Sequence, residues 1–82
     1  MEILIKQYMG SPSNYEVYLN NNDEVLTSVK GLSFLEVVLR INYLIKENKV
    51  STSDLIKYKF YNNSSEEVLN NQISVSQFIK RN

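Results

Sequence analysis

The longest amphipathic stretch of the chain is Leu32 to Asn48, where apolar residues recur at intervals of three and four positions. This spacing is typical of an α-helix with one apolar side, because about 3.6 residues complete each turn. Ser33 and Glu36 stand at its start with the spacing of a capping box, in which each side chain bonds the backbone N–H of the other residue. The side chains expected to face the core share one side of this helix: Phe34, Val37, Val38, Ile41, Leu44 and Ile45. We predict that the other elements pack around this central helix.

Three more large side chains of the same helix, Leu35, Leu39 and Tyr43, lie outside the main apolar side. A helix that is apolar on more than one side is usually covered on more than one side. Our first interpretation is that another part of the same chain covers this stripe, and the alternatives are a homodimer seam or a surface for a partner protein. On the polar side, Glu36 and Arg40 are four residues apart in the order that favours an ion pair.

Five short segments are rich in β-branched and aromatic residues and alternate between apolar and polar positions, which predicts β-strands. They are Glu2 to Met9, Tyr15 to Leu19, Glu24 to Val29, Leu55 to Tyr61 and Glu66 to Ile73. Turn-forming residues separate them in three places, Gly10 to Asn14, Asn20 to Asp23 and Asn62 to Ser65.

The end of the chain repeats a helix-start signal. Ser74 and Gln77 have the capping-box spacing and predict a short helix over Val75 to Arg81, while Val50 to Asp54 reads as a polar connector. The order of elements predicts one α+β domain over residues 1–82, with a mainly antiparallel sheet of about five strands, a central helix and a short C-terminal helix. The pattern does not determine the order of the strands between the two hairpins.

The two halves of the chain resemble each other when the second is laid on the first with Tyr58 on Tyr15. Both then read as a strand, an Asn-rich turn, a strand that begins Glu-Val-Leu, and a helix that begins at a serine. One interpretation is a duplication that gives two ββα units, and the other is convergence, because any hairpin followed by a helix uses the same residue types. We favour an internal repeat, since the matched residues keep the same parity in the strands.

The composition excludes most kinds of chemistry. Nine basic and nine acidic residues cancel, so overall charge does not favour nucleic acid or an anionic membrane. The chain has no His and no Cys, which removes the usual general base, the thiolate and the commonest metal ligands. Gly10 and Gly31 are too few for a phosphate-binding loop, and no serine stands in a nucleophile elbow. We therefore expect a protein that is not an enzyme and that uses no cofactor or metal.

The apolar segments are all short. None approaches the roughly 20 residues that span a bilayer, and the apolar part of Met1 to Gly10 is too short for a signal peptide. We expect a cytoplasmic protein without a membrane partner.

Strand parity gathers aromatic and basic side chains on the sheet face that turns away from the predicted helices. They are Tyr8, Tyr18, Lys57, Lys59 and Tyr61, and Lys6 shares their parity. Aromatic rings interleaved with lysines can stack bases and bind phosphates, although Glu16 on the same face offsets part of this charge. Tyrosine is also enriched on protein-binding surfaces, so we take these residues as candidates for partner binding.

By exclusion, the leading hypothesis is a small protein-binding module whose partner is a protein of unknown identity. Compact, cysteine-free single domains are common among accessory proteins of phages and plasmids, including inhibitors of host proteins, which is an analogy of size alone. The alternatives are a nucleic-acid-binding module that uses the Tyr/Lys face, and a self-associating structural protein that pairs through Leu35, Leu39 and Tyr43.

Overall fold

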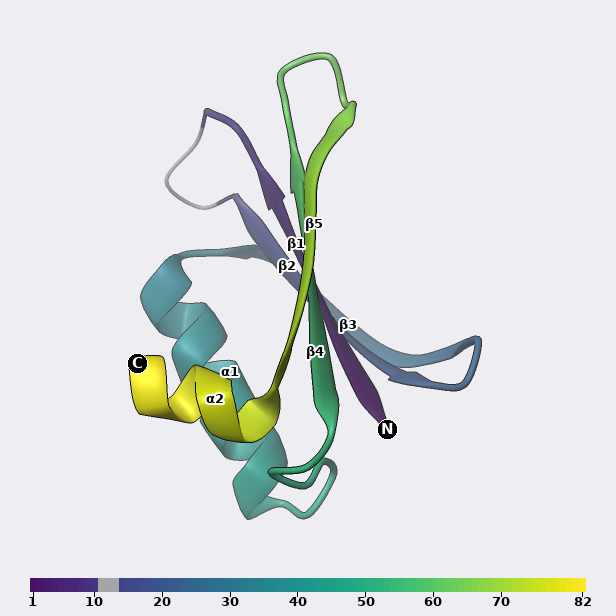
Figure 1. Cartoon of the computed structure of the whole chain (residues 1–82), viewed down its shortest axis with the longest axis vertical. Helices are drawn as coiled ribbons and strands as arrows, with labels where there is room; N and C mark the ends of the chain where they lie inside the picture. Colours follow the sequence, from purple (N-terminus) through teal and green to yellow (C-terminus); the bar gives the residue numbers. More distant parts are fainter. Residues whose placement is uncertain (11–13) are drawn as a thin grey trace.

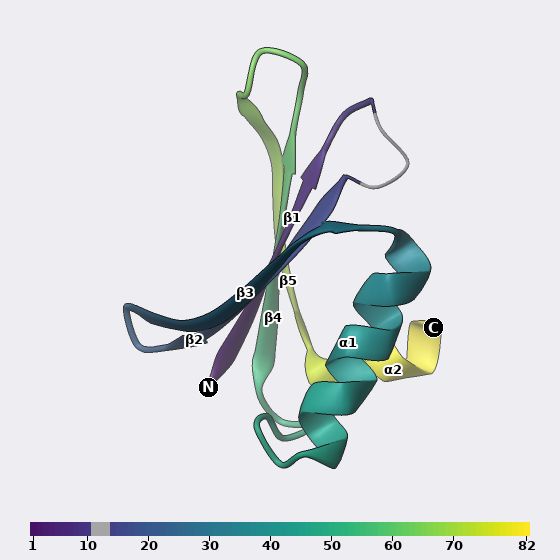
Figure 2. The ribbon, with the colours of Figure 1, turned by 180° about the vertical axis from the view of Figure 1, so that it is seen from behind.

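Both helices lie on the same face of a twisted five-stranded sheet, and the other face of the sheet is left open (Figure 1, Figure 2). This computed structural model describes residues 1–10 and 14–82. The strands are β1 (Glu2–Tyr8), β2 (Tyr15–Asn21), β3 (Glu24–Leu32), β4 (Leu55–Tyr61) and β5 (Glu67–Ser74). The helices are α1 (Phe34–Lys46) and α2 (Val75–Arg81). The predicted α+β class is confirmed, and of the turn expected over Gly10 to Asn14, residues 11–13 lie outside the described part of the chain.

Strand β1 lies in the middle of the sheet, whose order is β3-β2-β1-β4-β5. It pairs antiparallel with β2 and parallel with β4. Strands β2 and β3 form the first antiparallel hairpin, and β4 and β5 form the second. The sheet is therefore mainly antiparallel, as predicted, with one parallel pairing. A parallel pair needs a long crossover connection, and α1 lies in the chain that leads from the first hairpin to β4.

Residues of alternate parity point to opposite faces of the sheet. Ile3 and Ile5 are buried on the face that the helices cover. Leu4, one position away, lies between Tyr18 and Lys57 on the open face. The predicted faces of β1, β2 and β4 are thus confirmed.

The core is one apolar layer between the sheet and the helices. Its buried members are Ile3, Ile5, Val17, Leu19, Leu32, Val37, Ile41, Leu44, Val50, Ile56, Val75 and Phe78. The prediction that Phe34 belongs to this core is only partly right, because 45% of its surface is exposed. Phe34 is the first residue of α1 and lies at the margin of the core, where its ring packs at an angle against Tyr15 and Phe78, with ring centroids 5.7 Å and 6.4 Å away.

Both predicted capping boxes are present, at Ser33 with Glu36 and at Ser74 with Gln77. In the first, Ser33 Oγ accepts from the backbone N–H of Glu36 at 3.2 Å, and Glu36 Oε1 accepts from the backbone N–H of Ser33 at 3.0 Å. The bond that the Ser33 backbone N–H donates lowers the pKa of the Glu36 carboxyl. Because the cap holds Glu36, the predicted ion pair with Arg40 does not form between these two described residues.

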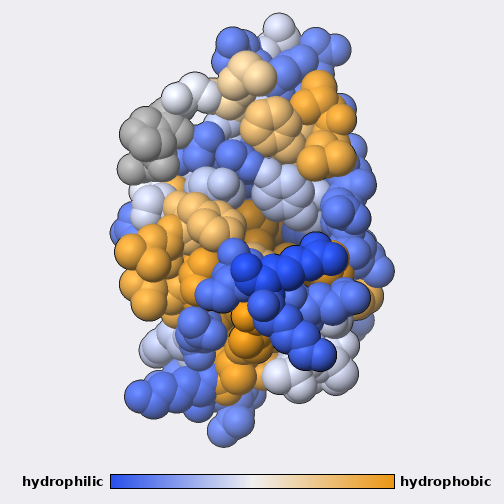
Figure 3. Space-filling view, turned by 60° about the vertical axis from the view of Figure 1, so that its left-hand side comes forward, coloured by the Kyte–Doolittle hydropathy of each residue, from blue (hydrophilic) through white to orange (hydrophobic). Residues whose placement is uncertain are grey.

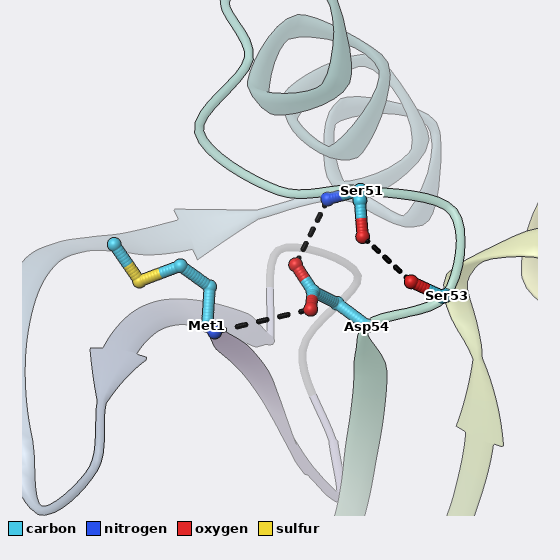
Figure 4. Close-up of polar contacts among 4 residues, drawn as sticks. All are labelled: Met1, Ser51, Ser53 and Asp54. Atoms are coloured by element: carbon cyan, nitrogen blue, oxygen red, sulfur yellow. Dashed lines mark hydrogen bonds and ion pairs between the residues drawn. The ribbon is translucent and has the colours of Figure 1, made fainter.

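The connection from α1 to β4 is a turn that Asp54 closes (Figure 4). One carboxylate oxygen of Asp54 accepts from the backbone N–H of Ser51 at 2.8 Å, and the other lies 3.8 Å from the amino group of Met1. The hydroxyls of Ser51 and Ser53 are 2.9 Å apart. The carbonyl of Asp54 accepts from the first N–H of α2, at Val75, at 2.9 Å. This short turn therefore ties the start of β4 to the start of α2.

The sequence-based interpretation of Val50 as part of a polar connector is wrong, because this residue is buried in the core. The carbonyl of Leu44 accepts from the backbone N–H of Lys49 at 2.8 Å and of Val50 at 3.4 Å. These bonds turn the chain back on the end of α1, where Asn48 has a positive φ of 57°, and carry Val50 under the helix.

The two hairpins lie symmetrically on either side of β1. Tyr15 of β2 is opposite Gln7, and Tyr58 of β4 is opposite Ile5. Ile5 and Gln7 are the neighbours of Lys6 in β1. A two-fold axis through Lys6 would exchange these positions, so the sheet register is compatible with the alignment of the two halves. The hairpin turns differ in length, and a duplication remains a prediction.

We predict that Ile41→Ala lowers the free energy of unfolding by about 2–5 kcal/mol, because Ile41 is fully buried where α1 meets the sheet. Ile41→Val should cost about 0.5–1.5 kcal/mol and keeps the measurement possible if the larger truncation prevents folding. Leu39→Ala, on the exposed side of the same helix, is the matched control and should change stability by less than about 0.5 kcal/mol. Urea unfolding followed by circular dichroism measures these differences, and equal losses at the two positions would contradict this placement of α1.

Candidate functional site

The open face of the sheet collects all five of the predicted partner-binding residues. We define this open face by the side chains of β1, β2 and β4 that point away from the helices: Leu4, Lys6, Tyr8, Glu16, Tyr18, Lys57, Lys59 and Tyr61. Across the parallel pair β1–β4, Tyr8 lies opposite Tyr61 and Lys6 lies opposite Lys59. The rings of Tyr8 and Tyr61 stack with centroids 5.1 Å apart and planes inclined by 16°. The structure therefore brings these candidates into one continuous surface.

Glu16 organises the tyrosines of the open face. Its Oε1 accepts from the hydroxyl of Tyr18 at 2.6 Å and from the hydroxyl of Tyr8 at 3.1 Å. Burial raises the pKa of both phenols, and the hydrogen bond to the Glu16 carboxylate raises it further, because an anion next to a carboxylate is disfavoured. Parity placed Glu16 on this face, but only the pairing of β1 with β2 shows that it accepts from both tyrosines.

The lysines of the open face have partners within the same molecule. Lys57 Nζ lies 3.5 Å from a carboxylate oxygen of Glu2, and Lys59 Nζ lies 3.4 Å from one of Glu67. Lys6 Nζ lies 5.0 Å from the centre of the Tyr18 ring, which is a cation–π distance. Because acidic neighbours offset this basic charge, the open face has less attraction for phosphates than its lysine content indicates.

The second surface is the outer stripe of α1, which we define as Leu35, Leu39 and Tyr43. Their exposed fractions are 67%, 58% and 48%. The interpretation that another part of the chain covers this stripe is therefore wrong for the described residues. The reason is geometric: the sheet occupies one side of α1, and α2 contacts β4 and β5, so neither element reaches the outer side of α1.

Two hollows lie between the outer stripe and β3, and Arg40 lines both of them. One has a volume of about 340 Å³ and is lined by Val29, Leu32 and Leu39 among others; the second, of about 240 Å³, includes Leu26 and Tyr43. The guanidinium carbon of Arg40 lies 5.2 Å from the centre of the Tyr43 ring. No described carboxylate lies within 4.0 Å of this guanidinium. Beside the stripe there are therefore two mainly apolar hollows, the larger one also lined by Glu36, and a cation that has no ion-pair partner among the described residues.

The side of the molecule on which the helices lie is uneven in character. Figure 3 shows hydrophobic side chains on both sides of a hydrophilic cluster on this side.

Comparison of the sequence with protein-family models and with curated proteins, and of the fold with solved structures, finds no match. Within residues 1–10 and 14–82, no group of three or more acidic, His or Cys side chains could hold a metal ion. Neither of the two described helices is long and apolar enough to cross a membrane.

We predict that the free energy of unfolding falls as the pH rises above about 10, and that Tyr18→Phe makes this fall shallower. The pKa of Tyr18 is raised in the folded state, so the unfolded chain loses its phenolic proton first and alkaline pH favours unfolding. Phenylalanine keeps the ring beside Lys6 but has no proton to lose. Urea unfolding between neutral pH and pH of about 11 checks this, and an unchanged slope in the variant would show that Tyr18 is not responsible.

Proposed function

We propose that this chain is a small, non-enzymatic protein-binding module that docks on a partner protein through the outer stripe of α1. The observation that supports this most directly is the exposure of Leu35, Leu39 and Tyr43 on one side of a helix whose other side buries Val37, Ile41 and Leu44. Burial of one such large apolar side chain by a partner would contribute about 1.5–3 kcal/mol to the free energy of binding.

The chemistry of the stripe describes the partner. The hollows on either side of Arg40 would take apolar side chains, and the guanidinium of Arg40 would pair with a carboxylate. Arg40 is already oriented by the Tyr43 ring and by Thr27, whose Oγ1 lies 3.5 Å from Nη2 of Arg40. The occupant we propose is therefore an apolar protein surface with an acidic residue near its centre. An inhibitor of a host protein, carried by a phage or plasmid, is a role that fits the small size of the chain.

The open face supports the nucleic-acid alternative less well. Nucleic acid needs lysines that can release counterions from phosphates, whereas Lys57 and Lys59 already face Glu2 and Glu67. The hydroxyls of Tyr8 and Tyr18 are likewise engaged with Glu16 on the same face. A surface with its polar groups satisfied in this way is more stable in water than the outer stripe of α1.

We predict that Leu39→Asp abolishes retention of the partner that the wild-type chain captures from a nuclease-treated lysate of its source organism. The introduced carboxylate would place charge at the centre of the apolar stripe, beside a hollow. A photo-crosslinking residue at Leu39 should give a crosslinked product with the same partner, and one at Lys57, on the opposite face, should not. If Leu39→Asp still retains the partner and only the crosslinking residue at Lys57 gives a product, the docking site lies on the open face instead.

We also predict that the double variant Lys57→Glu, Lys59→Glu captures the same partner as the wild type. Binding of labelled single-stranded DNA or RNA is the control that distinguishes the two functions, and it is measured for the wild type and for the double variant. Binding to the wild type should be negligible and insensitive to salt. Tight binding that falls steeply with salt and disappears in the double variant would establish the nucleic-acid function in place of the proposed one.

A further inference from the structure

The two edges of the sheet differ in how well they are protected. Edge strand β3 has two register irregularities against β2 and carries Lys30, and both features are known to discourage pairing with another strand. Edge strand β5 is regular from Leu69 to Ser74 and has no Pro and no charged residue in this segment. A long, regular and uncharged edge is a template for pairing with a further strand.

The register shows which backbone groups of β5 face outward. The backbone N–H of Val75 donates to the carbonyl of Asp54, and bonding residues alternate along an antiparallel pair. Asn71 therefore bonds to β4, whereas Asn70 and Gln72 direct their N–H and C=O groups away from the sheet. The only acceptor that the described residues offer to the N–H of Gln72 is the side-chain oxygen of Asn71, at 2.8 Å, an exposed group that can move aside.

The exposed segment of β5 reads the same in both directions by side-chain type. Asn71 lies at its centre, the amides Asn70 and Gln72 lie on either side, and the apolar Leu69 and Ile73 follow. Such a segment is complementary to itself when turned around its central residue, which is what a two-fold interface between identical strands requires.

We propose that β5 pairs antiparallel with β5 of a second copy of this chain around a two-fold axis at Asn71, which joins the two sheets into one. Asn70 of each copy then faces Gln72 of the other, and these are the residues whose backbone groups point outward. Leu69 of each copy faces Ile73 of the other on the helix side of the sheet. The proposal concerns a different surface from the outer stripe of α1 and does not rest on the proposed function.

Two features of the structure favour this register over its neighbours. An axis at Asn70 or at Gln72 would set an apolar side chain against an amide, because Leu69 or Ile73 would face Asn71. Leu69 is 50% exposed in the single chain. With the axis at Asn71, it lies next to a cavity of about 220 Å³ in the other copy, which Ile73 and Phe78 line. The strand residues that pair in this register, Leu69 to Ile73, carry no charge, because Glu67 lies outside this segment.

The test uses two variants of the residue on the axis. Sedimentation equilibrium of the purified full chain should show a reversible dimer, and Asn71→Lys and Asn71→Glu should each weaken it by about tenfold or more, because like charges would face each other across the axis. An equimolar mixture of the two variants should recover the dimer, since the introduced charges are then opposite. Recovery in the mixture also shows that both variants fold.

Two controls place the interface. Ser28→Lys adds a charge to the other edge strand, and Leu39→Asp adds one to the outer stripe of α1; both should leave the dimer intact. A wild-type chain that stays monomeric at about 1 mM would overturn the proposal. A dimer that Leu39→Asp dissociates while the Asn71 variants do not would also overturn it and assign the seam to α1. Partner capture is a separate measurement, so failure of one proposal can be distinguished from failure of the other.

Discussion

The apolar core between α1 and the sheet is the interaction on which the rest of this fold depends. Ile3 of β1 and Val37 and Ile41 of α1 are fully buried, and both hairpins attach to the two sides of β1. A strand that is paired on both sides and covered on one face has its register set by the apolar face, since a slip of one residue would expose every buried side chain. The two hairpins inherit their placement from this strand.

A chain of 82 residues covers the sheet with a single layer of helices, and the consequence is that two large surfaces remain in water. They are stabilised differently. On the open face, Glu16 accepts from two tyrosines and Lys57 and Lys59 have carboxylate partners, so polar groups satisfy one another. The outer stripe of α1 has no such internal compensation for Leu35 and Leu39, which is why our proposal places docking on the helix and not on the sheet.

The two hairpins are placed symmetrically about β1 but differ at their outer edges. The first hairpin ends in β3, which is irregular and charged, and the second ends in β5, which is regular between Leu69 and Ser74. Strand edges leave backbone donors and acceptors unpaired in the sheet, and only one of the two carries features that discourage a further strand. The backbone of the two hairpins is thus approximately symmetric, but the edge strands β3 and β5 differ in how readily a further strand could pair with them.

The elements of this protein and the faces of β1, β2 and β4 follow from the sequence, because the periods of 2 and 3.6 and the two capping boxes act between near neighbours. The five open-face residues were predicted for the same reason. The ends of β2 and β3 do not follow from the sequence, since these strands run on to Asn21 and Leu32, beyond the predicted Leu19 and Val29. Tertiary structure alone determined that β1 separates the hairpins, that Val50 is buried and that Leu39 is uncovered. Each of these depends on which distant segments meet, and a local period carries no information about the partner that lies across a strand pair or above a helix.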